Sequence, residues 1–233
     1  PVSEPARIKL YQSRVGSLSY LTQCTRPDMA LAVNKLCHYM SNPNENCFKA
    51  LDHCIRYLSG TPTLGLRFHQ GTSSTLRMEA YSDATFGGED IDSAKSQTGY
   101  VFYFGGGLID WSSHLQSVIA LSSAESEQLA AYSTARTCVY FRNLLSELGH
   151  TQFGPTTIHE DNTACISFSK NPVNYKRNRQ VLINHHYIRD LTENGIVRLE
   201  YLQTSDQIAD MFTKPLAPKD FQKFRPFLVS DVS

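Results

Sequence analysis

Apolar residues recur at helical spacing through the first seventy residues of the chain. Met29, Val33 and Leu36 follow one another at intervals of three or four residues, which is typical of the buried face of a helix. A second stripe with the same spacing covers residues 44–59 and stops at Gly60. The pattern predicts a small helical bundle that packs on its neighbour, and no residue in it suggests catalysis.

From about residue 64 the pattern changes to the alternation of apolar and polar residues that β-strands show. The glycines at 105–107 interrupt this alternation. Because neither a Lys-Ser/Thr pair nor a helix follows them, they predict a hairpin turn and not a phosphate-binding loop. About three consecutive antiparallel strands are expected from the alternating segments, which are 65–70, 75–84, 96–104, 107–114 and 117–121.

The second half of the chain alternates helical and extended patterns. A long helix is predicted from Ser123 to about Leu148, ended by Gly149. Further along, strands are expected over 155–160 and 196–203, and helices over 163–171, 181–193, 206–214 and 218–228. Antiparallel strands followed by alternating helices and strands predict an α/β fold, a mixed sheet with helices on its faces.

Composition places the chain among globular proteins, with 41% hydrophobic and 19% charged residues. Its 22 basic and 22 acidic residues cancel, so the net charge neither indicates nor excludes a nucleic-acid partner. No apolar run approaches the roughly 20 residues that span a bilayer, and the first residues lack an apolar signal core. We therefore expect no membrane partner, and an intracellular chain or one cut from a longer polypeptide. The six cysteines form no C-x-x-C pair, so buried thiols are expected and not a zinc site.

Three aspartates lie where such a fold builds a site. Asp83 lies within a predicted strand among apolar residues, where a charge is costly unless it is paired or binds a metal. Asp161 directly follows the predicted strand 155–160, at the carboxyl end where α/β sheets commonly place their sites. Asp210 lies in the predicted short helix 206–214.

A fourth candidate comes from the segment SSAESEQ, which opens the long helix and carries two glutamates. Ser122 and Glu125 fit a capping box, in which each side chain satisfies the free backbone N–H of the other residue. Glu127 is two residues further on, roughly 200° around the helix, so it points away from Glu125. We therefore expect Glu125 to start the helix and Glu127 to carry chemistry.

Carboxylates that converge in an apolar cleft repel one another unless a cation neutralises them. Oxygen ligands of this kind suit Mg²⁺, and two such ions about 4 Å apart activate a water and stabilise the 3′-oxygen that leaves a phosphodiester. The elements therefore predict a metal site that acts on phosphodiesters, built from Asp83, Glu127, Asp161 and Asp210.

Seven stretches carry a resemblance to a known family, in order and over nearly the whole chain: VGSLSYLTQCTRPDMALAV, ALDHCIRYLSGTPTLGL, AYSDA, SQTGYVFYFGGGLIDWSS, ALSSAESEQLA, EDNTACISFSKNP and DQIADMFTKPL. The chain resembles the C-terminal part of the polyprotein of copia-type LTR retrotransposons, namely the end of the reverse transcriptase and its ribonuclease H domain. The resemblance implies a ribonuclease H-like mixed five-stranded sheet with flanking helices over residues 71–233, preceded by a small helical connection segment over residues 1–70. The metal ligands that it implies are Asp83, Glu127, Asp161 and Asp210, with Asp206 the less favoured choice in the same predicted helix as Asp210.

The function implied by the resemblance is an endonuclease that hydrolyses the RNA strand of RNA/DNA hybrids with two Mg²⁺ ions, for which Mn²⁺ can substitute. The implied partners are an RNA/DNA hybrid and the polymerase portion of the same polyprotein. The implied location is intracellular, in a cytoplasmic particle, the nucleus or both. The sequence contains no Tyr-x-Asp-Asp motif, so DNA synthesis is not expected of this chain.

The chain departs from the family pattern over residues 178–184, which are largely apolar where members carry a charged, His-bearing stretch. The mobile histidine that helps product release in ribonucleases H falls here on His185 or His186, and His186 is our candidate. A histidine packed on its helix is the alternative. The departure leaves a second hypothesis open: a decayed or domesticated module that binds nucleic acid or protein without cutting.

A local basic stretch gives a candidate surface for the nucleic acid. No acidic residue lies between Lys170 and Arg189, which suits contacts with phosphates, although a solvated loop has the same composition. A hybrid would be recognised there by its shape and 2′-hydroxyls, without base specificity. The candidate phosphate-binding residues are Lys170, Lys176, Arg177 and Arg179.

Overall fold

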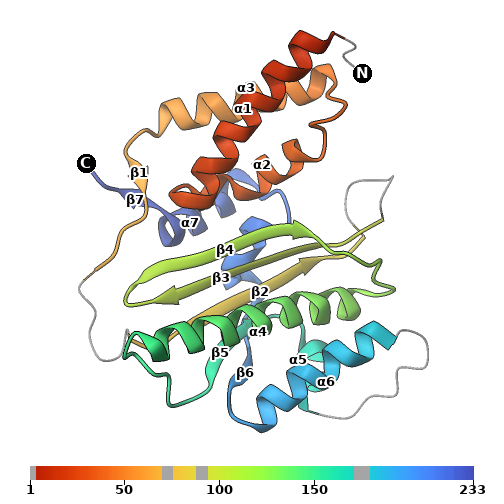
Figure 1. Cartoon of the computed structure of the whole chain (residues 1–233), viewed down its shortest axis with the longest axis vertical. Helices are drawn as coiled ribbons and strands as arrows, with labels where there is room; N and C mark the ends of the chain where they lie inside the picture. The colour runs from red at the N-terminus through yellow and green to blue at the C-terminus, as the bar shows by residue number, and fades with distance from the viewer. Residues whose placement is uncertain (1–3, 70–75, 88–93, 171–178) are drawn as a thin grey trace. The chain divides into compact units, whose positions relative to one another are not determined.

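The computed structural model describes residues 4–69, 76–87, 94–170 and 179–233, and the chain divides into two compact units (Figure 1). The helical unit comprises residues 1–67 and 216–233, and the sheet unit comprises residues 68–215. The predicted boundary was residue 70, and residues 216–233, which we assigned to the sheet domain, group with the helices. The reason is a short antiparallel pair, β1 (Leu64–Gly65) with β7 (Ser230–Asp231), which holds the end of the chain in the helical unit.

The helical unit confirms the predicted bundle. Its helices are α1 (Pro5–Cys24), η1 (Pro27–Met29), α2 (Ala30–Cys37), α3 (Glu45–Gly60) and α7 (Pro218–Leu228). The apolar stripes meet in a core that includes Tyr11, Val15, Val33 and Leu51. At the start of α3 the side chain of Asn44 accepts the backbone N–H of Cys47 at 3.0 Å, which satisfies one of the free donors of the first turn.

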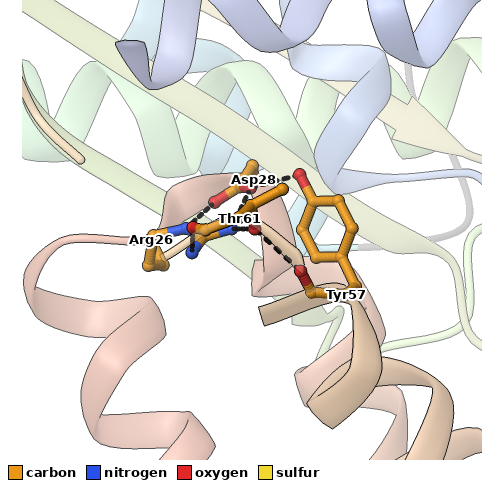
Figure 2. Close-up of polar contacts among 4 residues, drawn as sticks. All are labelled: Arg26, Asp28, Tyr57 and Thr61. Atoms are coloured by element: carbon orange, nitrogen blue, oxygen red, sulfur yellow. Dashed lines mark hydrogen bonds and ion pairs between the residues drawn. The ribbon is translucent and has the colours of Figure 1, made fainter. Parts of the chain in front are cut away.

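A buried ion pair links η1 to the end of α3 (Figure 2). The Arg26 guanidinium donates to both carboxylate oxygens of Asp28, at 3.0 and 2.9 Å, and both side chains are almost fully buried. The Tyr57 hydroxyl donates to Asp28 at 2.7 Å, and Arg26 also donates to the backbone oxygen of Thr61 at 3.0 Å. Because each charge has a counter-charge and further hydrogen bonds, the network offsets the cost of its burial.

The sheet unit contains the predicted mixed sheet. Its strands are β2 (Glu79–Thr85), β3 (Gln97–Phe104), β4 (Gly107–Leu115), β5 (Thr156–Glu160) and β6 (Val197–Tyr201). The spatial order is β4-β3-β2-β5-β6, in which β2, β3 and β4 run antiparallel while β5 and β6 continue parallel to β2. Gly105 and Gly106, both at positive φ, form the turn between β3 and β4, which confirms the predicted hairpin.

The helices α4 (Ser123–Glu147), α5 (Thr163–Lys170) and α6 (Arg179–Glu193) lie together on one side of this sheet (Figure 1). Their apolar residues and those of the strands form one core, which includes Ala80, Phe102, Ala131, Ile158, Ile188 and Leu199. As predicted, α4 ends before a glycine at positive φ, Gly149.

Three expected elements differ from the structure. Of the expected strand 65–70 only Gly65 pairs, and the described residues after it form no strand. Residues 117–121 are not a strand either, because β3 begins at Gln97 and offers no ladder partner beyond Gln116. The expected α-helix 206–214 consists of two 3₁₀ segments, η2 (Thr204–Asp206) and η3 (Ile208–Phe212).

The cysteines and the helices bear on two further expectations. All six cysteines carry free thiols, and Cys47, Cys54, Cys138 and Cys165 are buried. Within the described ranges, none of the helices combines the length and the apolar character that crossing a bilayer requires.

Candidate active site

Three of the four predicted carboxylates converge in the sheet unit. Asp83 comes from β2, Glu127 from the first turns of α4, and Asp161 from the residue after β5. One carboxylate oxygen of each lies within 4.8 Å of those of the other two, and Asp83 and Glu127 are buried while Asp161 is half-buried. Since β2 and β5 are parallel neighbours, their carboxyl ends meet at one edge, where the start of α4 adds the third side chain.

The fourth predicted residue, Asp210, lies in η3 and is buried next to Asp83. The carboxyl of Asp83 contributes to a raised pKa at Asp210, and Lys214 forms an ion pair with Asp210 at 2.8 Å. The hydroxyl of Thr213 donates to Asp83. The segment 210–214 therefore supplies one acid, one base and one hydroxyl to the same cluster.

The two glutamates of SSAESEQ take different positions. Ser122 is the N-cap of α4, and its hydroxyl accepts the backbone N–H of Glu125 at 3.2 Å. The Glu125 carboxylate accepts the N–H of Leu121 at 3.0 Å, where we had expected the N–H of Ser122. The Glu125 half of the capping box is thus shifted by one residue toward the N-terminus, and Glu125 still stabilises the start of the helix. Glu127 points toward Asp83 and Asp161 instead.

Burial and mutual repulsion raise the pKa of every carboxyl in this cluster for which a shift is resolved. For Glu127, burial together with Glu160, Asp83 and Asp161 raises the pKa to about 11. For Asp210, burial and then Asp83 raise the pKa to about 7, against the opposing effect of Lys214. Burial also raises the pKa of Asp83, although Lys214 and Thr213 oppose the rise. The cluster therefore requires protons or cations to be stable near neutral pH.

Glu160 is a fifth acidic residue of the cluster, and the sequence reasoning missed it. Its side chain is fully buried at the end of β5, and burial and then Asp83 raise its pKa. One of its oxygens accepts the N–H of Asn162 at 3.2 Å. The signal was present in the alternation of β5, in which Thr156, Ile158 and Glu160 are buried and the residues between them are not.

Two uncharged residues hold η3 against the sheet, and these also escaped the sequence reasoning. The fully buried Gln207 side chain donates to the backbone oxygen of Ser82 at 2.9 Å and accepts the N–H of Ala209. This side chain caps η3 and explains why no continuous α-helix forms there. Gly99, which pairs with Asp83 in the sheet, has no room for a Cβ, because that atom would lie 2.7 Å from the Cβ of Phe212. The missing side chain lets η3 reach the carboxylates.

The donor set fits a hard divalent cation. Each of the clustered acids offers carboxylate oxygens, the ligands that Mg²⁺ and Mn²⁺ prefer. The Oε2 atoms of Glu127 and Glu160 are buried and accept no hydrogen bond from the described residues. A buried carboxylate oxygen without a hydrogen bond is costly unless it is protonated or binds a cation, so the residues suit such an ion.

The remaining predicted site residues lie elsewhere or outside the described residues. His186 is exposed on α6 with its ring 5.6 Å from that of His185, which is buried, and no described contact joins His186 to the carboxylates. Lys176 and Arg177 lie outside the described residues, as do the side chains of Lys170 and Arg179. The roles expected of these five residues stay predictions.

A mixed sheet in the order β4-β3-β2-β5-β6, with helices on one side and acidic residues at the strand ends, defines a ribonuclease H-like domain. The chain is 39% identical over 214 residues, 92% of its length, to the retrovirus-related Pol polyprotein from transposon RE2 of Arabidopsis thaliana. It is 36% identical over 212 residues to the corresponding polyprotein from transposon TNT 1-94 of Nicotiana tabacum. The chain belongs to the copia-type retrotransposon Pol polyproteins, and it spans 14% and 16% of the length of these two relatives.

The foamy viral protease-reverse transcriptase, solved in complex with an RNA/DNA hybrid, is a structural neighbour. It is 13% identical, with a TM-score of 0.53, over 90% of this chain and 26% of its own length, which shows a shared fold. No protein-family profile matches the chain.

Proposed function

We propose that this chain is a metal-dependent endonuclease that hydrolyses the RNA strand of RNA/DNA hybrids as part of a retrotransposon Pol polyprotein. The observation that carries the proposal is the convergence of Asp83, Glu127 and Asp161 from three separate elements, with Asp210 beside Asp83. A binding module has no use for several buried acids that raise one another's pKa, whereas a two-metal nuclease requires them.

Each acid has a distinct place in the proposed mechanism. Buried Asp83 and Glu127 would hold the cations from the protein side and exclude bulk water, while half-buried Asp161 would bind at the side open to substrate. Asp210 would complete the ligand set, held in place by η3. When bound, two Mg²⁺ ions, or Mn²⁺ in their place, supply an activated water and stabilise the leaving 3′-oxygen.

The proposed partners are an RNA/DNA hybrid and the polymerase portion of the same polyprotein, in an intracellular particle, the nucleus or both. Support comes from the Pol relatives and from the structural neighbour that was solved with a hybrid. We propose Lys170, Lys176, Arg177 and Arg179 for phosphate contacts, and His186 for product release.

The alternative of a decayed module rests on the altered segment 178–184. In the structure Asn184, at the end of this segment, and the next residue, His185, are buried on α6, so this end of the segment contributes to packing. A change of packing residues on α6 does not alter the clustered carboxylates. The retained carboxylates favour the active enzyme over the binding module.

A hybrid-cleavage assay tests the proposal with wild type, Asp83→Asn and Asp220→Asn, the last being an exposed acid on α7. We expect wild type and Asp220→Asn to cut the RNA strand in Mg²⁺ and to stop in EDTA. Asp83→Asn should lose activity by orders of magnitude, because the substitution replaces a proposed metal-binding carboxylate by a neutral amide. A wild-type protein that binds hybrid and cuts it with neither Mg²⁺ nor Mn²⁺ would establish the decayed module instead.

A further inference from the structure

Lys214 places a positive charge beside one of the proposed metal ligands, Asp210. Its ammonium nitrogen lies 2.8 Å from Oδ1 of Asp210, four residues earlier in the chain. The ammonium is therefore a direct partner of one of the four proposed ligands.

The backbone that carries Lys214 is held firmly on the sheet. The hydroxyl of Ser113 on β4 donates to the backbone oxygen of Phe212 at 2.6 Å. The N–H groups of Thr213 and Lys214 both donate to the backbone oxygen of Asp210, each at 3.2 Å. The fold thus fixes the backbone from which the Lys214 side chain reaches Asp210.

The two partners of the ion pair differ in exposure. The Asp210 side chain is 6% exposed, whereas that of Lys214 is 37% exposed. A long, flexible lysine at this exposure can turn its ammonium into water without any change in the backbone, but the buried carboxylate cannot follow it. The pair can therefore open on the lysine side alone.

We propose that Lys214 is a built-in counter-cation that occupies Asp210 in the metal-free site and competes with the divalent ion for this carboxylate. The inference rests on the proposed function, because it takes Asp210 as a ligand. Lys214 is in this sense a positioning residue: its ammonium holds the Asp210 carboxylate in place until the metal displaces the ammonium. Its presence weakens metal binding, so the site is poised to take up and release its ions.

Isothermal titration calorimetry with Mg²⁺ and with Mn²⁺ tests the proposal on the whole chain. The variants are Lys214→Met, Lys214→Gln, Lys214→Arg and, as a control, Lys219→Met on an exposed part of α7. Removal of the competing charge should lower the Kd for metal about two- to five-fold in the Met and Gln variants, the range that an ion pair of this exposure supports. Lys214→Arg and Lys219→Met should stay near the wild-type Kd.

A second measurement separates competition from a purely structural role. In EDTA the Met and Gln variants should melt at a lower temperature than wild type, because the carboxylates lose their counter-charge, and saturating Mg²⁺ should abolish the difference. Circular dichroism checks that each variant is folded. If Lys214→Met does not fold, Lys214→Gln is used in its place. A wild type that binds metal while both variants bind it equally well or more weakly overturns the role of Lys214 and leaves the nuclease intact. If neither wild type nor the variants bind metal, the proposed function falls, and this inference falls with it.

Discussion

Replacement of Glu127 and of Glu125, two residues apart in α4, should change the stability of the metal-free protein in opposite directions. Glu125→Ala removes the carboxylate that accepts the N–H of Leu121 at 3.0 Å, so the start of α4 loses one capping interaction. Loss of such a cap costs about 1 kcal/mol. Glu127→Gln keeps the shape of the side chain but removes an acid that the fold holds at a cost.

The size of that cost follows from the raised pKa of Glu127. A carboxyl whose pKa is raised in the folded state destabilises the fold at every pH above its ordinary value, here 4.5. With a folded pKa of about 11, the side chain is protonated at pH 7 in the folded protein and ionised in the unfolded one. The interval from 4.5 to pH 7, at about 1.4 kcal/mol per pH unit, corresponds to roughly 3 kcal/mol. We therefore expect Glu127→Gln to raise the free energy of unfolding by about 1–3 kcal/mol.

Urea denaturation in EDTA, followed by circular dichroism at pH 7 and pH 5, measures both effects. The gain in Glu127→Gln should shrink below about 1 kcal/mol at pH 5, because the wild-type carboxyl is then closer to its unfolded pKa. In saturating Mg²⁺ wild type should become more stable than Glu127→Gln, because wild type gains binding free energy that Glu127→Gln does not. A Glu127→Gln protein that is destabilised in EDTA, as Glu125→Ala is, would refute the reasoning and make both glutamates scaffolding.

Two further substitutions test the framework around the site. Asp28→Asn removes the counter-charge of a buried guanidinium and should lower the free energy of unfolding by about 3 kcal/mol in urea denaturation, whereas Asp52→Asn, in an exposed pair of 3.8 Å, should change it by less than about 0.5 kcal/mol. If Asp28→Asn and Asp52→Asn lowered the free energy of unfolding equally, burial would not be what makes the Arg26–Asp28 pair important. Gly99→Ala places a Cβ 2.7 Å from Phe212 and should weaken Mg²⁺ binding in calorimetry by displacing η3, while Gly16→Ala, with no atom within 4 Å of its Cβ, should bind as wild type does.

The fold was predictable where a local pattern coincided with a tertiary requirement. The glycines at 105–107 have to turn the chain between two alternating segments, and Gly149 follows the last apolar position of a long helix, so both positions are as expected. The predictions for segments 117–121 and 206–214 were wrong because each depended on distant residues. Residues 117–121 alternate like a strand but have no neighbouring strand to pair with. In segment 206–214 the side chain of Gln207 is bonded to the backbone of Ser82, a contact that the local sequence does not reveal.

The site was predictable from its charges and not from the residues that support them. Asp83 and Asp161 attract notice because an acid beside apolar residues has to be explained. Glu160 has the same property, but only its neighbour Asp161 was predicted. Gln207 and Gly99 are neutral and common, and their importance lies in contacts with residues more than 70 positions away, such as Ser82 and Phe212. Only the assembled sheet shows what they do.

Under the proposed function, the cluster ties the stability of the sheet unit to metal. Its acids come from β2, α4, β5 and η3, so the unfolded chain has no preformed site, and an ion that binds only the folded state adds its binding free energy to folding. The raised pKa values of Glu127 and Asp210 measure what the folded protein gives up when the ion is absent. Asp210 is also the acid whose partner, Lys214, can leave without disturbing the backbone. In the proposed site, the entry of metal would require only that protons and one ammonium group depart, while β2, α4 and β5 keep the other ligands in place.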